Sequence, residues 1–438
     1  MVQLLTLFAN PVAEAAAQVH YVADGSREMI RDSQARARTL NVLVFGILFA
    51  SIIYYPLYYA YASFAYLYHA LAAGVFIYCV LLFRPAVNIA FVGLVAYGVL
   101  MSFVAVVGIL ISDNILHISQ VTLYLILPTS LYIAGCNISS SFLLRCLSFL
   151  LLVVFVFTVL ERAEFWLGID LFGFVDYGAR MKVAAMSYGA DPTYARASGL
   201  FVNPNQLGFF AGAVLFAILS IRAPSRIRGL IPIGVMAVVL VILSGSRGSL
   251  IALGAAAVTY VSVTRSFRFL LVIVASALVV FAGYITISAT ETGTFGAFTD
   301  RLLYTSVYQN ESLLGRMAFW SSVMDRVNLL TGTLIPPEMY LGHPVDSFYM
   351  RMLAQGGVLG LVSSVLLLGA QFASSRRLAP DRAKGAFWAL ITFVVVNSFS
   401  MMGLLDLEAV FVWTIMGLVA SRQWSGGAIA QPGYAVAR

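Results

Sequence analysis

An arginine lies between two apolar runs in the segment "VILSGSRGSLIAL", residues 241–253. The guanidinium of Arg247 offers five donors in a planar fork that matches phosphate oxygens. The flanking residues are all small, so we expect them to allow close backbone approach and to add N–H and hydroxyl donors; they are Gly245, Ser246, Gly248 and Ser249. The segment predicts either an anion site at a membrane surface or a tight hairpin whose arginine reaches lipid headgroups.

A second arginine precedes an Asn-Pro-Asn turn in "RASGLFVNPNQLGFF", where Arg196 is the first residue. Proline after asparagine is typical of a turn or of a helix start. Asn203 and Asn205 are therefore predicted either to cap a helix or to contact sugar hydroxyls and phosphates. Arg196 is predicted to bind phosphate or to anchor the chain at the membrane interface.

Two further groups follow late in the chain. "NESLLGRMAFWSSVMDRV" has helical apolar spacing and predicts an amphipathic helix that carries Arg316. "GHPVDSFY" precedes an apolar run and contains His343, Asp346 and Tyr349. The Asp346 carboxylate can cap a helix or act as a general base, and His343 is the alternative base.

Metal-binding patterns are absent from the sequence. The four histidines are scattered and no HExxH pattern occurs. We therefore expect metal-independent chemistry that needs no cofactor and in which arginines replace a divalent ion.

Long apolar runs position these groups. The chain has 438 residues, of which 61% are hydrophobic and 10% charged, a composition typical of a polytopic membrane protein. Runs long enough to cross a hydrocarbon core of roughly 30 Å predict an all-α protein with about twelve transmembrane helices, centred near residues 50, 73, 99, 127, 151, 213, 237, 256, 279, 362, 392 and 412. The three cysteines show no metal-site or disulfide pattern.

Loop charge predicts the orientation of these helices. With both termini in the cytoplasm, most of the 26 lysines and arginines lie on the cytoplasmic side, as the positive-inside rule requires. The basic net charge of +7 therefore reflects topology and gives no reason to expect nucleic acid as a partner. The predicted order is a cytoplasmic tail (1–39), helices one to five (40–160), a periplasmic segment (161–204), helices six to nine (205–289), a large periplasmic loop (290–346), helices ten to twelve (347–421) and a cytoplasmic tail (422–438).

Some basic residues oppose the positive-inside trend. Most lie in or beside the two long external segments, where loops commonly carry functional groups; they are Arg162, Arg180, Lys182, Arg196, Arg247, Arg301, Arg316, Arg326 and Arg351. Their position predicts that the functional face is the external one.

Four segments in order resemble the O-antigen polymerase and O-antigen ligase superfamily of bacterial inner-membrane glycosyltransferases. They are "RASGLFVNPNQLGFF", "LSGSRGSLIAL", "GRMAFW" and "VDSFYMRMLAQGGVLGL". The resemblance implies a GT-C-like membrane architecture and periplasmic transfer of a glycan from undecaprenyl diphosphate. It also implies that Arg196, Arg247 and Arg316 bind the diphosphate.

The last segment separates two activities within that family. Ligases, which transfer the glycan to lipid A core, typically carry His-Asn followed two residues later by Tyr. This chain has Asp346 and Ser347 there, with Tyr349 in register. The carboxylate favours a polymerase of O-antigen or exopolysaccharide whose acceptor is a second lipid-linked repeat unit, and a ligase is the alternative. The family also implies a partner protein that regulates chain length.

A third interpretation comes from another class of protein. Twelve-helix transporters and lipid-glycan flippases also need arginines near a diphosphate. They usually have repeated halves and ionisable groups at mid-membrane. The sequence shows no convincing repeat, and its unexplained charges gather at one face, so we favour a glycosyltransferase.

Overall fold

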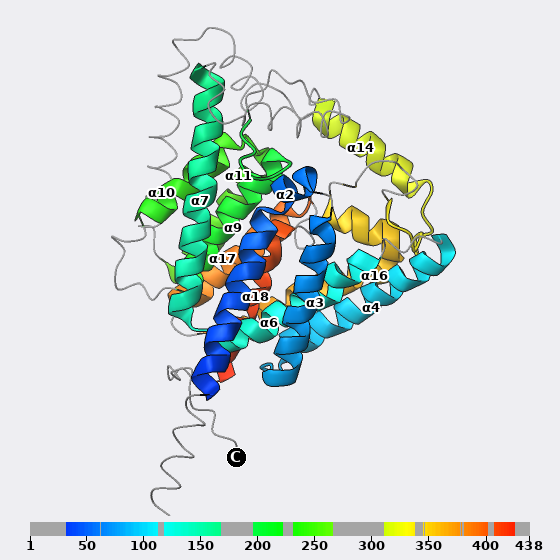
Figure 1. Cartoon of the computed structure of the whole chain (residues 1–438). Coiled ribbons are helices and arrows are strands. Elements are labelled where there is room, and N and C mark those ends of the chain that lie inside the picture. The colour runs from blue at the N-terminus through cyan, green and yellow to red at the C-terminus, as the bar shows by residue number, and fades with distance from the viewer. Residues whose placement is uncertain are drawn as a thin grey trace, which may run out of the picture.

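The computed structural model describes a bundle of helices (Figure 1). No strand occurs among the residues that it describes, which are 32–61, 63–112, 118–167, 196–221, 231–265, 311–337, 345, 347–376, 378, 381–401 and 407–424. The predicted ninth span near residue 279, both predicted tails for the most part, His343 and Asp346 lie outside these residues.

The first half of the chain forms a helix at Asp32–Ile52 followed by shorter and longer helices in close succession. They are α2 (Tyr54–Ala60), α3 (Phe64–Leu82), α4 (Ile89–Ser112), α5 (Ile118–Val121), the π-helix η2 (Thr122–Ile126), α6 (Leu127–Asn137) and α7 (Ser140–Leu167). Elements α5, η2 and α6 run on without a break as one apolar segment, Ile118–Asn137.

The second half contributes the helices that carry the predicted functional groups. They are α9 (Pro204–Ile221), α10 (Ile231–Leu243), α11 (Arg247–Thr264), α14 (Glu311–Met324), α16 (Phe348–Ser375), α17 (Asp381–Asn397), the 3₁₀ turn η7 (Leu407–Ala409) and α18 (Val410–Trp424). Helix α17 packs against α9, α11 and α16, and α18 packs against α6. Almost every residue of α9 is buried, so α9 lies at the centre of its neighbours.

Eight of the described helices are long and apolar enough to cross a membrane, and the helices Ile231–Leu243 and Val410–Arg422 are apolar but shorter. Several of the eight expose large apolar side chains outward; Leu67, Leu81, Leu110 and Leu366 are each more than 60% exposed. A helix that is apolar on its outer face as well as its inner face suits lipid rather than water. The chain is therefore an all-α polytopic membrane protein, as the composition predicts.

Contacts of Arg422 show which ends of three helices meet. The guanidinium of Arg422, near the end of α18, donates to the carbonyls of Ser220 (3.1 Å) and Ile221 (3.0 Å) at the end of α9, and to the hydroxyl of Ser140 (2.7 Å) at the start of α7. A cation there satisfies carbonyls that have no partner within their own helix. The ends of α9 and α18 and the start of α7 thus meet at one end of the bundle.

Helix α16 is broken at Gly357, whose φ of 62° lies in the left-handed region. The break frees backbone groups, and the loop Asn328–Ile335 satisfies them. Thr333 N donates to Ala354 O (2.8 Å), Leu334 N donates to Gln355 O (2.9 Å), and Val358 N donates to Leu329 O (2.8 Å). Irregular backbone within a membrane bundle is stable only where such groups are paired.

We expect Gly357→Ala to destabilise the protein. A side chain at a positive φ costs about 1–3 kcal/mol, and a Cβ at this position would also collide with the carbonyl of Leu330. Thermal unfolding of the purified protein in detergent, followed by tryptophan fluorescence, should show a lower midpoint. Gly369→Ala on the same helix is the control, because a Cβ there meets no atom within 4 Å; equal midpoints for the two variants would contradict this account of the break.

Candidate functional site

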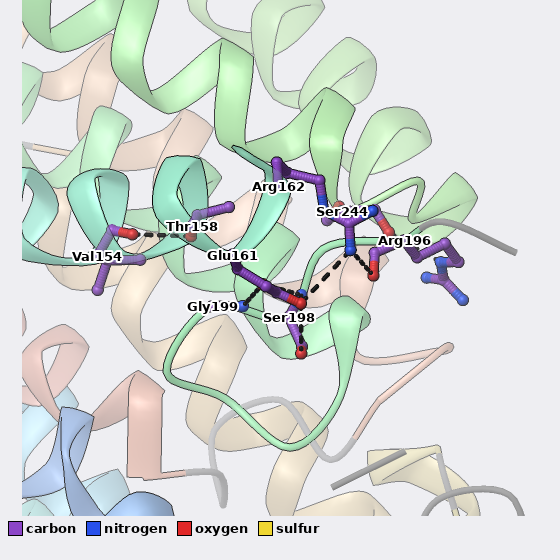
Figure 2. Close-up of polar contacts among 8 residues, drawn as sticks. All are labelled: Val154, Thr158, Glu161, Arg162, Arg196, Ser198, Gly199 and Ser244. Atoms are coloured by element: carbon purple, nitrogen blue, oxygen red, sulfur yellow. Dashed lines mark hydrogen bonds and ion pairs between the residues drawn. The ribbon is translucent and has the colours of Figure 1, made fainter. Parts of the chain in front are cut away.

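Arg196 bridges the end of α10 and the start of α9. Its Nε donates to the carbonyl of Ser244 (2.8 Å), and its terminal nitrogen donates to Oδ1 of Asn205 (2.7 Å). The side chain is only partly buried. The segments "RASGLFVNPNQLGFF" and "LSGSRGSLIAL", which are separated in the sequence, therefore lie side by side, as Figure 2 shows for Arg196 and Ser244.

The arginine of the second segment begins a helix. Helix α10 ends at Leu243, Gly245 turns the chain with a φ of 55°, and Ser246 is the N-cap of α11, whose first residue is Arg247. The Ser246 hydroxyl oxygen accepts from Ser249 N (3.2 Å). The predicted position of "SGSRGS", between the end of one helix and the start of the next, is confirmed.

The small residues of this turn pack against the neighbouring helices. The side chains of Ser244, Ser246 and Ser249 are buried, and their hydroxyls bond within the turn and to adjacent helices. A Cβ on Gly208 of α9 would lie 2.6 Å from the Ser249 hydroxyl oxygen, and a Cβ on Gly248 would collide with the Ser400 hydroxyl. The glycines and serines thus bring α9, α11 and α17 close together, and the serine hydroxyls face inward.

Three of the described arginines lie at the end of the bundle formed by this turn. Helices α9 and α11 begin at this end and α7, α10 and α17 end there, so positive and negative ends of helix dipoles lie together. Arg162, Arg196 and Arg247 add three guanidinium groups, and the carboxylate that accompanies them, Glu161, is buried against Arg162. These four described side chains have a formal net charge of +2.

Hydrogen bonds join the start of α16 to the end of α17. Ser347 is the N-cap of α16 and accepts from Met350 N (3.5 Å), while Phe348 N donates to the carbonyls of Ser398 (2.9 Å) and Met401 (3.0 Å). The Tyr349 hydroxyl donates to Val395 O (3.0 Å), and its ring packs on Phe399 with centroids 4.7 Å apart. Tyr349 is thereby held against α17. Asp346 precedes it by three residues in the sequence.

Asn397 joins the second segment to the fourth, and the sequence analysis did not identify it. This fully buried side chain donates to the Ser249 hydroxyl (3.0 Å) and accepts from the Ser400 hydroxyl (3.1 Å). The residue that follows it, Ser398, provides one of the carbonyls that bind the start of α16. The signal in the sequence was an amide at the end of the apolar run "FVVVNSFS".

Arg316 lies on a separate element, α14. The end of this helix and the residues after it pack on α16, where Val323, Val327 and Ala354 form a small apolar cluster. Figure 1 shows α14 apart from α10 and α11. The structure thus places Arg196 beside the turn that precedes Arg247. Arg316 lies on a different helix, which packs on α16.

The two predicted asparagines differ in their contacts. Asn203 Oδ1 accepts from Asn205 N (2.9 Å), and Gln206 Oε1 accepts from Asn203 N (3.1 Å), which is the reciprocal arrangement of a capping box at the start of α9. Pro204 then occupies the first helical position, where its missing N–H costs nothing. Asn203 caps the helix, and Asn205 orients Arg196.

We expect Asn203→Ala to lower the stability of the protein by about 1 kcal/mol, the usual cost of losing an N-cap. Asn203→Asp keeps a capping oxygen and should retain that stability. Thermal unfolding in detergent measures both variants. A destabilisation as large in Asn203→Asp as in Asn203→Ala would contradict the capping role, and loss of activity in a stable Asn203→Asp protein would favour sugar contact.

Neither a scan against protein-family models nor a search of curated proteins found a match to the chain.

Proposed function

We propose that this protein is a polysaccharide polymerase of the bacterial inner membrane, with its active site on the periplasmic face. It transfers a growing glycan from undecaprenyl diphosphate to a hydroxyl of an incoming lipid-linked repeat unit of O-antigen or exopolysaccharide. The observation that carries this proposal is the meeting of Arg196 and Arg247 at the shared start of α9 and α11. Twelve spans, cytoplasmic termini and a GT-C-like architecture belong to the same proposal.

A diphosphate suits this end of the bundle for two reasons. A guanidinium group binds phosphate through two parallel N–H···O hydrogen bonds. Helix N-termini attract anions through unpaired N–H groups and the helix dipole. A lipid carrier also delivers its diphosphate at the membrane surface while its chain stays among the spans, whose outer faces are apolar. The donor is thus a lipid with an anionic head, and the acceptor is a second molecule of the same class.

The proposed reaction is a displacement at the anomeric carbon of the donor sugar. The acceptor oxygen forms a bond to that carbon as the bond from carbon to phosphate oxygen breaks, and undecaprenyl diphosphate leaves with the electron pair. Arg196 and Arg247 stabilise the negative charge that develops on the leaving group, and Arg316 on α14 is the third ligand. Asp346 accepts the proton of the acceptor hydroxyl, with His343 as the alternative base and Tyr349 beside it. Asn205 holds Arg196 in place during this step.

Arg247→Ala should abolish polymerisation without unfolding the protein. Loss of a group that stabilises developing charge typically lowers the turnover number by about 10²–10³-fold, so surface glycan should fall to single repeat units. The measurement is the length distribution of surface glycan in a deletion strain that carries the variant, with membrane protein level checked in parallel. Arg145→Ala is the control, since Arg145 is an exposed arginine near the start of α7, at the opposite end of the bundle.

The glycan that accumulates also distinguishes the alternatives. Lipid A core with single units indicates an O-antigen polymerase, whereas undecorated core with polymer retained on the carrier indicates a ligase. Loss of only a secreted polymer or capsule indicates an exopolysaccharide polymerase. Long-chain glycan of normal amount in the Arg247→Ala strain would refute the assignment of this arginine to the reaction.

Asp346→Asn removes the basic group at residue 346 while it preserves the size of the side chain. We expect polymerisation in purified, lipid-reconstituted protein to slow by about 10²–10⁴-fold, the range for loss of a general base. His343→Ala tested beside it identifies the base: the larger loss marks the residue that takes the proton. Full activity of Asp346→Asn would leave His343 as the base.

A further inference from the structure

A buried ion pair on α7 touches the Arg196 segment and belongs to none of the four sequence segments. Glu161 and Arg162 are only 5% and 2% exposed, and their charged groups lie 3.4 Å apart. Burying two charges is costly unless further hydrogen bonds compensate them. Figure 2 shows further contacts of this pair with Arg196, Ser198 and Gly199.

The Glu161 carboxylate binds the backbone just after Arg196. Its Oε2 accepts from Gly199 N (2.7 Å) and from Ser198 N (3.1 Å), and Oε1 lies 3.5 Å from the Ser198 hydroxyl. Hydrogen bonds to an ionised acceptor are about twice as strong as neutral ones. The carboxylate therefore fixes the direction of the chain at this point.

Arg162 binds the same segment at residue 196, before the residues that the Glu161 carboxylate contacts. Its terminal nitrogen donates to the carbonyl of Arg196 (2.6 Å). On the opposite side, Ala197 N donates to Leu243 O (2.9 Å) at the end of α10. The backbone of residues 196–199 is thus held between α7 and α10. From this position the guanidinium of Arg196 reaches Ser244 and Asn205.

Gly199 shows how closely this segment lies against α7. Its φ is 58°, and a Cβ on it would lie 2.5 Å from the Thr158 hydroxyl oxygen. Thr158 itself donates to Val154 O within α7 (2.7 Å). The turn at Gly199 therefore fits directly onto the helical face that carries Glu161.

We propose that Glu161 and Arg162 are a positioning pair that sets the place of the Arg196 guanidinium for binding the anionic head of the donor. The pair does not touch the substrate; it acts through the backbone of Arg196 and of the residues after it. This inference rests on the proposed function for its ligand, a lipid diphosphate, but the contacts that carry it are independent of that function.

The experiment is a double-mutant cycle between Glu161→Gln and Arg196→Ala. Glutamine keeps the shape and one acceptor oxygen, so the variant is suited to fold, while it loses the charge that compensates Arg162. Purified protein in lipid nanodiscs is titrated with undecaprenyl diphosphate, and affinity is compared among the wild type, both single variants and the double variant. Asp381→Asn is the control for loss of a carboxylate, since Asp381 forms an exposed ion pair with Lys384 elsewhere.

Glu161→Gln should weaken diphosphate binding about tenfold, which corresponds to about 1.4 kcal/mol, and Asp381→Asn should leave it unchanged. A positioning residue acts only through its target, so the double variant should bind no more weakly than Arg196→Ala alone. If Glu161→Gln costs a further tenfold in the Arg196→Ala background, the two effects are independent and the positioning role is overturned.

A second readout separates this inference from the proposed function. The rate at which phenylglyoxal modifies Arg196, followed by peptide mass spectrometry, reports the placement of the guanidinium without any ligand. We expect that rate to rise in Glu161→Gln and to stay at the wild-type value in Asp381→Asn. A wild type that binds no diphosphate, with this rise present, would refute the proposed function and keep the positioning pair. An unchanged modification rate would overturn the pair itself.

Discussion

The bridge that Arg196 makes between Ser244 and Asn205 is the contact on which the candidate site depends. Its guanidinium donates to the Ser244 carbonyl, just after α10, and to the Asn205 side-chain oxygen, in the first turn of α9. Polar groups at helix ends have no partner within their own helix, and here one cation serves two helices. The groups that stabilise the fold at this end are therefore the same groups that the proposed chemistry uses.

A chain of short contacts extends from this bridge through the whole end of the bundle. It begins at Glu161 on α7, passes through Arg196 to the turn before α11, and continues through Ser249 and Asn397 to the start of α16. Arg422 makes the corresponding connection at the opposite end. Two polar clusters, with an apolar core between them, are what a bundle needs in order to keep its helix ends in register.

Local patterns in the sequence predicted the parts of this arrangement that depend on local physics. Apolar runs predicted the helices, because any long apolar segment in lipid must pair its own backbone. Asn203 and Pro204 predicted the start of α9, because capping depends on adjacent residues. The roles of Glu161 and Asn397 were missed because their partners lie 38 and 148 residues away. The break at Gly357 was missed for the same reason, since the loop that compensates it is distant in sequence.

The inward direction of the serine hydroxyls in "SGSRGS" has a consequence for recognition. Ser244, Ser246 and Ser249 are buried, so the proposed ligand would meet the Arg247 charge at this turn rather than an array of hydroxyl groups that could match the stereochemistry of a sugar. In the proposed function, such a surface would bind the diphosphate that all carrier-linked donors share and would not contact the sugars that distinguish them. If one surface binds the anion and another binds the sugars, the glycan specificity of the proposed polymerase could change without any change in this turn.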